Sequence, residues 1–273
     1  MDDTQVPRTL LDAQSALPSV SNAVAIASAK GGVGKSTVTT NLALALVQSG
    51  AKVGLLDADI YGPSLPILMG ASGEPELTPE NKMVPVRSHG VSMMSVGFIA
   101  GQDMPVIWRG PLLGQAVQQF LHQVEWGELD YLLIDLPPGT GDIPLTLSQS
   151  IGLSGAVIVT TPQQVSIEDV ERGIAMFERV EVDVLGVVEN MSYFLCADCG
   201  QRHEIFSKGG GRDLAAKLGL NLLGEIPLES GICAAGDRGR PIVLEQPEGP
   251  VSEIFNEIGR AMVRELIRLE EDG

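Results

Sequence analysis

The sequence predicts an α/β fold, with a doubly wound, mostly parallel sheet and helices on both of its faces. Short runs rich in Val, Ile, Leu and Ala alternate along the chain with stretches in which apolar residues recur at helical spacing. The apolar runs are typical of strands that are buried on both faces, which is how parallel strands lie in a sheet. Because parallel strands are joined by crossover connections, the alternation predicts a helix after most strands.

The predicted elements follow one another from the N-terminus. A strand is expected at Ala23–Ser28, then a glycine-rich loop and a helix from Ser36 to about Ser49, which Gly50 ends. Further strands are expected at Lys52–Leu56, Val91–Val96, Tyr131–Ile134, Ala156–Thr160, Val184–Glu189 and Leu222–Ile226. Further helices are expected at Pro111–Val124, Ile143–Ser150, Ile167–Arg179 and from Val251 onward. Residues 70–88 are polar, contain three prolines and predict a loop.

Composition narrows the classes of function. The 273 residues suffice for one large domain, expected at residues 22–273 after a flexible tail at 1–21. A net charge of −17 disfavours nucleic-acid binding and electrostatic attachment to anionic membranes. No apolar run reaches the roughly 18–20 residues of a membrane-spanning helix, and the N-terminal segment lacks the apolar core of a signal peptide. Three cysteines without a paired framework fit a cytoplasmic location.

The segment Ala29–Thr37 has the pattern of a phosphate-binding P-loop. It lies between a predicted strand and a predicted helix, where backbone N–H groups and a helix N-terminus form a nest for phosphate oxygens. Glycine lets the backbone wrap the anion closely, lysine supplies charge to the terminal phosphates, and the serine hydroxyl binds magnesium. The predicted nucleotide-binding residues are Gly31, Gly32, Val33, Gly34, Lys35, Ser36 and Thr37.

A second lysine, Lys30, stands five residues before Lys35. This pattern resembles the deviant P-loop of the ATPase group that contains MinD, the nitrogenase iron protein and the arsenite pump. In that group the early lysine crosses a dimer interface to the nucleotide of the other subunit. The resemblance implies that Lys30 acts in trans on the phosphoryl oxygens, as an arginine finger does.

Three aspartates stand where predicted strands stop. Asp57 and Asp59 follow one strand, and Asp135 follows another. The carboxyl ends of parallel strands meet at one edge of a sheet, where ligands gather. We expect Asp57 and Asp135, together with Ser36, to hold magnesium, and Asp59 to orient the attacking water.

Cys196 and Cys199 form a Cys-x-x-Cys turn in a segment, residues 192–206, that is predicted to be a short hairpin. Such a turn points two thiolates at one metal, and Gly200 lets the backbone bend its N–H groups toward sulfur. Two sulfurs do not complete a four-ligand site. Four thiolates are reached most simply with two chains, so the hairpin predicts the same dimer that Lys30 implies.

Other ligands and other chemistries stay open at this point. Cys233 stands alone in an apolar stretch and is expected to be a small core residue. His203 could add a ligand but is more often structural in a hairpin strand. Zinc also suits four thiolates. A thioredoxin-like redox pair is disfavoured, because such motifs begin a helix after a strand.

The motifs together, in this order, resemble the Mrp/ApbC-type ATP-binding proteins, a family of iron–sulfur cluster carriers. The resemblance covers roughly Val20 to Val263. Besides the P-loop and the Cys-x-x-Cys turn, it is carried by Leu56–Ser64, Trp108–Pro111, Ile134–Asp142, Thr161–Gln163, Val188–Ser192, Lys208–Gly211, Glu225–Leu228 and Gly236–Val243.

This resemblance implies a function and further site residues. Family members bind a [4Fe–4S] cluster between two subunits through the Cys-x-x-Cys pair, hydrolyse ATP slowly and pass the cluster to apo-proteins. The resemblance places Asn190 and Pro227 near the adenine base. It implies ATP, Mg²⁺ and a [4Fe–4S] cluster as cofactors. The implied partners are a second copy of the chain, apo iron–sulfur proteins and, in addition, scaffold proteins.

Three other functions compete with cluster carriage. A MinD-type positioning or partition ATPase lacks the cysteine hairpin and ends in a basic amphipathic membrane helix, whereas this chain ends in the acidic segment Arg268–Gly273. An electron donor like the nitrogenase iron protein has ligand cysteines far apart in sequence. A zinc-stabilised dimeric ATPase is the third alternative. We predict a cytoplasmic, ATP-hydrolysing iron–sulfur cluster carrier.

Overall fold

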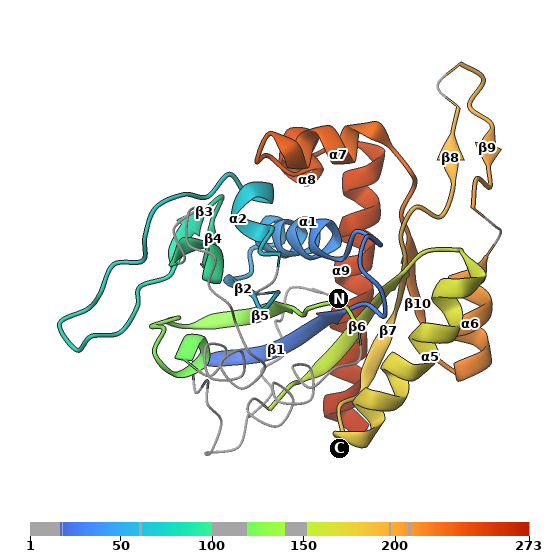
Figure 1. Cartoon of the computed structure of the whole chain (residues 1–273). Helices are drawn as coiled ribbons and strands as arrows, with labels where there is room; N and C mark the ends of the chain where they lie inside the picture. The colour runs from blue at the N-terminus through green and yellow to red at the C-terminus, as the bar shows by residue number, and fades with distance from the viewer. Residues whose placement is uncertain are drawn as a thin grey trace.

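The computed structural model describes residues 17, 19–59, 62–99, 119–139, 152–196, 198–206 and 209–272, with the backbone alone at residues 164–168. Within these residues, helices lie on both sides of a central twisted sheet. A small two-stranded hairpin, made of β8 (Phe194–Leu195) and β9 (Arg202–His203), projects from the body (Figure 1).

The main sheet has eight strands in the described part of the chain, in the order β10-β7-β6-β1-β5-β2-β4-β3. Neighbouring strands are parallel except β3 and β4 at one edge, which are antiparallel. Its strands are β1 (Val20–Ala27), β2 (Val53–Asp57), β3 (Val86–Ser88), β4 (Val91–Ser95), β5 (Leu129–Asp135), β6 (Gly155–Thr160), β7 (Val184–Glu189) and β10 (Leu222–Glu225). This order confirms the predicted doubly wound, mostly parallel sheet.

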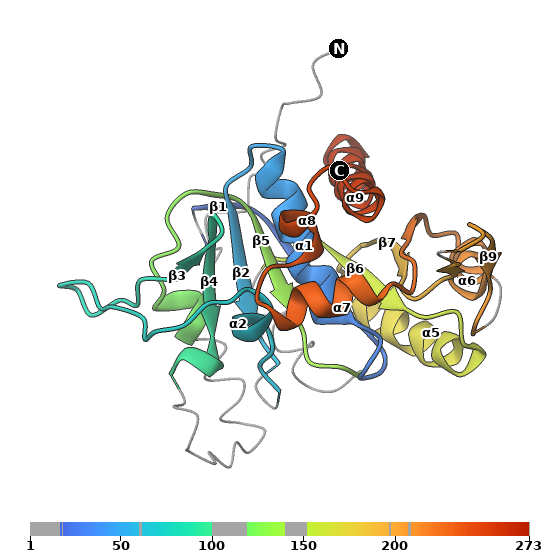
Figure 2. The same ribbon diagram turned by 90° about the horizontal axis from the view of Figure 1, so that it is seen from above.

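Helices cover both faces of this sheet (Figure 2). On one face lie α1 and α9, with α2, α7 and α8 beside them, and on the other lie α5 and α6. The bounds of the described helices are α1 (Lys35–Gln48), α2 (Leu65–Leu68), α5 (Gln164–Arg179), α6 (Gly210–Leu218), α7 (Ser230–Asp237), α8 (Ile242–Glu245) and α9 (Pro250–Asp272), with a 3₁₀ turn, η1, at Val96–Phe98.

Two hydrophobic cores result from this layering. Val24 and Ile26 of β1 belong to the core beneath α1 and α9, whereas Ala23 and Ala25 belong to the core beneath α5 and α6. Successive side chains of a strand point to opposite faces, so a strand buried on both faces is apolar throughout. This explains why the central strands are continuous apolar runs in the sequence.

The C-terminal helix α9 is docked on the domain. Phe255, Ile258, Met262 and Leu266 recur at helical spacing and are buried. They pack against the core that α1 also covers. The apolar face of α9 is therefore used inside the domain. Among the described residues, none of the helices combines the length and the hydropathy that a membrane span needs.

Several boundaries differ from the prediction. β1 begins at Val20, two residues before the predicted domain start, and Leu17 and Val20 are both buried; residues 1–16 of the predicted tail lie outside the described residues. The predicted 70–88 loop contains a strand, β3, and a bridge between Leu77 and Met83, and it extends away from the body on the side opposite β8–β9 (Figures 1 and 2).

Two predicted helices fall largely outside the description. Of the helix expected at 111–124, residues 119–124 are described; residues 119–122 are helical, and residues 123 and 124 are not. The helix expected at 143–150 lies entirely outside the described residues. Of the segments that carried the resemblance, residues 60, 61, 108–111, 140–142, 197 and 208 also lie outside.

Candidate functional site

The P-loop connects the end of β1 to the start of α1. Gly32 and Gly34 have left-handed φ angles of 80° and 82°, which glycine adopts without strain. Gly34 is also the N-cap residue of α1 and has no side chain to cap its first turn. The N–H groups at the start of α1 therefore face the loop, as an anion-binding helix N-terminus requires. The segment after β5 closes on the loop, because Gly139 N donates to the Ser28 carbonyl at 2.9 Å.

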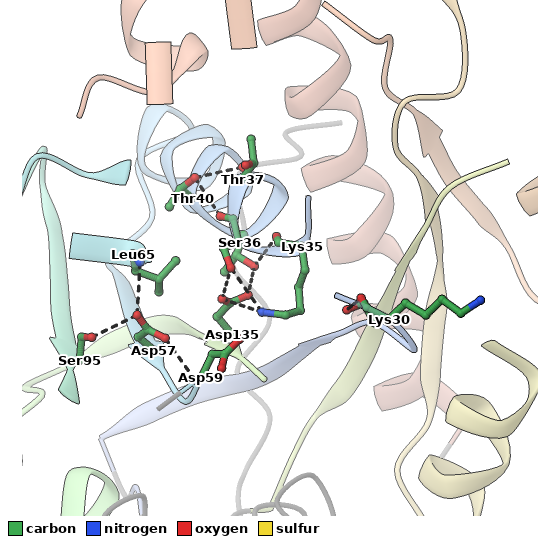
Figure 3. A network of polar contacts seen from close by, with 12 residues as sticks. Lys30, Lys35, Ser36, Thr37, Thr40, Asp57, Asp59, Leu65, Ser95 and Asp135 are labelled. Carbon is green, nitrogen blue, oxygen red and sulfur yellow. Dashed lines mark hydrogen bonds and ion pairs between the residues drawn. The ribbon is translucent and has the colours of Figure 1, made fainter. Parts of the chain in front are cut away.

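The carboxylate of Asp135 contacts polar side chains from the start of α1, at the end of the P-loop (Figure 3). The Lys35 ammonium lies 2.7 Å from Asp135 Oδ2, and both side chains are buried. Ser36 Oγ donates to Asp135 Oδ2 at 2.6 Å, and Thr39 Oγ1 donates to Oδ1 at 2.7 Å. A buried carboxylate without these partners would be strongly destabilising. The structure thus brings Lys35, Ser36 and Asp135 together as predicted.

Asp57 lies beside Asp135, since the two residues are paired in register at the ends of β2 and β5. Its Oδ2 accepts from Leu65 N at 3.2 Å and from Ser95 Oγ at 3.1 Å. Burial, with the nearby charge of Asp135, raises the pKa of Asp57 from its ordinary 3.8 to about 7. Two carboxylates this close favour a shared cation or a shared proton.

The donor set suits magnesium. Carboxylate and hydroxyl oxygens are the ligands that Mg²⁺ prefers, and in nucleotide sites one or two carboxylates act together with substrate phosphates. Asp57, Asp135 and Ser36 supply oxygens of this kind at one edge of the sheet. In the described part of the chain, no group of three or more His, Cys, Asp or Glu side chains is placed to hold a metal ion alone.

Asp59 lies just beyond the end of β2 at the same edge and is half-buried. Its backbone N–H donates to Asp57 Oδ1 at 3.2 Å, and Figure 3 shows it near Asp57 and Asp135. The position is compatible with the predicted role in orienting water. The two residues that follow, 60 and 61, lie outside the described residues.

Lys30 points away from Lys35 and the aspartates (Figure 3). Its ammonium lies 2.8 Å from Asp169 on α5. Asp169 also pairs with Arg172 at 3.2 Å, and hydrogen bonding to Lys30 lowers the pKa of Asp169. A single chain therefore does not bring Lys30 to its own phosphate site.

The two residues expected near the adenine base differ in what the structure shows of them. Asn190 is buried against the P-loop, and its Nδ2 donates to the Val33 carbonyl at 2.8 Å. Pro227 is buried just after β10. Its neighbours pair with the chain that leaves β7, through Ser192 N to the Ile226 carbonyl at 2.9 Å and Leu228 N to the Tyr193 carbonyl at 2.6 Å.

The cysteine turn closes a hairpin, as predicted. β8 (Phe194–Leu195) pairs antiparallel with β9 (Arg202–His203). Cys196 N donates to the Gln201 carbonyl at 2.9 Å, and Gly200 turns the chain with φ 68°.

Both thiols of the turn are accessible, since Cys199 is exposed and Cys196 half-exposed. The backbone N–H groups of Cys199 and Asp198 lower the pKa of Cys196, which favours the thiolate, the form in which a cysteine can act as a metal ligand.

Two expectations about other ligands have different outcomes. His203 lies opposite Phe194 in the hairpin ladder, with ring centroids 6.5 Å apart, which is a structural cross-strand contact. The expectation that Cys233 is a core residue is wrong, because Cys233 is exposed on α7. The buried residues of α7 are Ala235 and Gly236, so the helix turns its cysteine outward.

Sequence reasoning missed several supporting residues. Thr39, which contacts Asp135, stands one helical turn after Lys35 and could have been found from that spacing. Ser95 is the last residue of β4, at the same sheet edge as Asp57, and could have been found as a polar residue at the end of a predicted strand. Asp169 gave no signal, because only tertiary packing brings α5 to Lys30.

The chain is similar to proteins with descriptions that concern iron transfer. Residues 19–263 match the family model described as ParA: NUBPL iron-transfer P-loop NTPase. An iron–sulfur cluster carrier protein of Synechocystis sp. is 51% identical over 94% of this chain and 74% of that protein. The iron–sulfur cluster transfer protein NUBPL of Dictyostelium discoideum is 45% identical over 94% of this chain and 80% of that protein.

Solved structures share the fold. A nucleotide-binding protein from Archaeoglobus fulgidus, in complex with ADP, has a TM-score of 0.76 at 40% identity and covers 92% of this chain and 95% of that chain. The MinC:MinD cell division protein complex of Aquifex aeolicus gives a TM-score of 0.65 at 24% identity, which shows likeness of fold alone. The family match includes both the P-loop and the cysteine hairpin, and the chain therefore belongs to the NUBPL iron-transfer P-loop NTPases.

Proposed function

We propose that the protein binds and hydrolyses ATP and carries an iron–sulfur cluster of the [4Fe–4S] type. Two copies of the chain hold this cluster between their hairpins and pass it to apo-proteins. The observation that carries the proposal is the pair of accessible thiols, Cys196 and Cys199, on a projecting hairpin of an iron-transfer NTPase. Relatives named as cluster carriers support it.

The cluster is cargo, and its ligand count argues for two chains. Clusters of this type take four thiolates. Each hairpin offers two, and no further ligand cluster exists among the described residues. A bridging cluster at the hairpin tips is open to an acceptor, which suits transfer. It is also open to solvent, so we expect it to be labile to oxygen.

Exposed apolar side chains on the hairpin segment support a contact with another chain. Phe194, Leu195, Ile205 and Phe206 are 38–55% exposed, and all of them belong to the hairpin segment. Large apolar side chains gathered on a projecting element are typical of interaction sites. The hairpin thus combines the proposed metal ligands with apolar surface that another protein can cover.

At the nucleotide site, the loop N–H groups and Lys35 bind the phosphates. When nucleotide binds, the Lys35 ammonium leaves the carboxylate of Asp135 and contacts the terminal phosphates. Its positive charge then stabilises the negative charge that develops on the phosphoryl oxygens during hydrolysis. Asp59 orients the attacking water. Magnesium, held by Ser36, Asp57 and Asp135, would neutralise phosphate charge.

Lys30 completes the site of the other copy. Its side chain is held by Asp169 in the single chain, so this ion pair must open for Lys30 to reach a partner's phosphates. Both groups are partly exposed, and such a pair is weak enough to exchange. Asn190 and Pro227 flank the base in this proposal.

The cluster assignment predicts a specific iron content. Chain reconstituted without oxygen should bind about four iron and four sulfide per two chains. Cys196→Ala and Cys199→Ala should each abolish this, whereas Cys233→Ala, which removes an exposed thiol on another element, should leave it unchanged. Iron, sulfide and zinc analysis measures the result. Zinc without iron in the wild type, or loss of iron in Cys233→Ala, would contradict the assignment.

The P-loop assignment predicts that Lys35→Ala weakens ATP binding at least about tenfold, because a charge-assisted contact to the phosphates is lost. Lys52→Ala is the matched control, since that lysine is exposed and paired with Glu128 far from the loop. Isothermal titration calorimetry gives both affinities. Equal affinities in Lys35→Ala and the wild type would refute the site.

The trans role of Lys30 predicts complementation. Lys30→Ala should bind nucleotide nearly normally but lose turnover, and so should Asp59→Asn. Mixing the two variants should restore part of the ATPase rate, because each mixed dimer contains one site with both groups intact and one site with neither. If mixed dimers form and no activity returns, Lys30 does not act in trans.

The raised pKa of Asp57 predicts a pH-dependent stability in nucleotide-free protein with EDTA. The folded state holds the Asp57 proton more tightly than the unfolded state does. The contribution of this proton to the free energy of unfolding is therefore fully present below about pH 4 and is lost as the pH rises through about 7. Asp57→Asn should lack this loss, and its gain over the wild type at pH 8 should approach roughly 4 kcal/mol. Urea unfolding at pH 5 and pH 8 tests this, with the exposed Asp213→Asn as control. Identical pH profiles would contradict it.

A further inference from the structure

A single buried carboxylate holds both ends of the hairpin insertion. Glu189, the last residue of β7, is fully buried. Ser192 Oγ donates to Glu189 Oε1 at 2.5 Å, at the point where the chain leaves for the hairpin. Gly211 N, in the first turn of α6, donates to Glu189 Oε2 where the chain returns. We call Glu189, Ser192 and Gly211 the hairpin root.

The hairpin root is built for a carboxylate. A Cβ atom on Gly211 would lie 2.8 Å from Glu189 Oε2, so only glycine allows this approach. Gly209, the N-cap residue of α6, has no side chain to cap the helix, and Glu189 serves that purpose from β7. The positive end of the helix dipole stabilises the buried charge. Neither nucleotide chemistry nor metal ligation, as proposed above, uses this carboxylate.

The next residue, Asn190, holds the P-loop. Its Nδ2 donates to the Val33 carbonyl at 2.8 Å, and its backbone N–H donates to the Thr160 carbonyl at 2.8 Å. A Cβ atom on Gly34 would lie 2.3 Å from Asn190 Nδ2, so loop and side chain are in tight contact. A shift of the loop therefore displaces Asn190.

Nucleotide binding acts on the same peptide group that Asn190 holds. The Val33 carbonyl and the Gly34 N–H belong to one planar peptide unit. Phosphate oxygens orient the N–H groups of a P-loop. An anion that turns the Gly34 N–H must also turn the Val33 carbonyl, which is hydrogen-bonded to Asn190. The Asn190 contact therefore differs between the nucleotide-free and the nucleotide-bound states, and a ligand can drive a conformational change only through such a difference.

The connection between the P-loop contact and the hairpin root is short and strained. Met191, between Asn190 and Ser192, has a left-handed φ of 53°, which is unfavourable for a residue with a long side chain. Such backbone persists where surrounding bonds fix it, and it concentrates at switch regions. Here the fixing bonds are Ser192 N to the Ile226 carbonyl and Ile226 N to the Glu189 carbonyl, both at 2.9 Å.

Beyond the root, side-chain contacts continue into the hairpin. The Arg202 guanidinium of β9 lies 3.9 Å from the centre of the Tyr193 ring and 3.3 Å from Glu225 of β10. Tyr193 immediately follows Ser192 and leads into β8. A displacement at the root therefore changes the direction in which the hairpin carries its thiols.

We propose that Asn190 and Glu189 are positioning residues that couple nucleotide occupancy of the P-loop to the orientation of the Cys196–Cys199 hairpin. Asn190 senses the loop, and Glu189 transmits its position to both ends of the insertion. The biological use of this coupling rests on the proposed function, since it would let ATP turnover change how a cluster is presented. The coupling itself is a property of the metal-free chain and is tested without a cluster.

The test measures thiol reactivity in the full-length, metal-free Cys233→Ser protein. Alkylation of Cys196 and Cys199 by iodoacetamide is followed by mass spectrometry at one pH, with and without saturating Mg-ADP. We expect ADP to change the rate by about fivefold or more, the lower range of typical coupling between sites. Ser192→Ala removes one bond of the root but no group of the nucleotide site, and should reduce this ratio to within about twofold of unity while ADP affinity is retained.

Two variants sharpen the result. Ser252→Ala removes another buried serine hydroxyl, one that binds the Ile242 and Gln246 carbonyls, and should keep the full ADP effect. Glu189→Gln keeps the side-chain shape but removes the charge, and should behave like Ser192→Ala.

The proposal is overturned if ADP binds without changing the wild-type rates. It is also overturned if Ser192→Ala and Glu189→Gln shift the rates equally with and without ADP and leave the ratio intact, which is what a purely structural role predicts. Either outcome leaves the iron content unaffected, so failure of the coupling and failure of cluster carriage are distinguishable.

Discussion

The buried ion pair between Lys35 and Asp135 is the interaction on which the nucleotide edge depends. It joins the P-loop to the end of β5, and Ser36 and Thr39 attach α1 to the same carboxylate. A buried charge tolerates the loss of such partners poorly. A ligand that removes Lys35 or Ser36 from Asp135 must therefore leave this carboxylate with a replacement partner. A magnesium ion would be such a partner.

The parallel sheet puts two different chemistries on one edge. The ends of β1, β2 and β5 carry the P-loop, Asp57 and Asp135, and the end of β7 leads to the thiol hairpin. β6 alone separates β1 from β7 in the sheet. Ligands gather at the carboxyl ends of parallel strands for reasons of topology, and the same topology places the hairpin root beside the loop. Asn190, the residue after β7, donates a hydrogen bond directly to the P-loop.

Features that depend on contiguous residues were predictable from the sequence. The P-loop was predictable because its glycines, Lys35 and Ser36 are contiguous in the sequence. Asp57 and Asp135 were predictable because each stands at the end of an apolar strand. The hairpin was marked by the cysteine spacing and Gly200. The doubly wound sheet followed from apolar runs that its two cores explain.

Features that depend on tertiary packing were not predictable. Lys30 meets Asp169 only because α5 packs beside the loop. α7 consists mostly of small and apolar residues, so no pattern indicated that Cys233 faces outward. β3 is three residues long and follows Pro85, too short for a periodic signal. The role of Glu189 requires that the two ends of an insertion meet, which spacing cannot reveal.

Cluster sharing between two chains is tested most directly by native mass spectrometry of the protein, reconstituted and measured without oxygen. If two hairpins hold one cluster between them, each pair of chains carries one cluster, and Cys199→Ala chains carry none. A full cluster on a single chain, or a dimer that carries zinc in place of iron and sulfide, would contradict it.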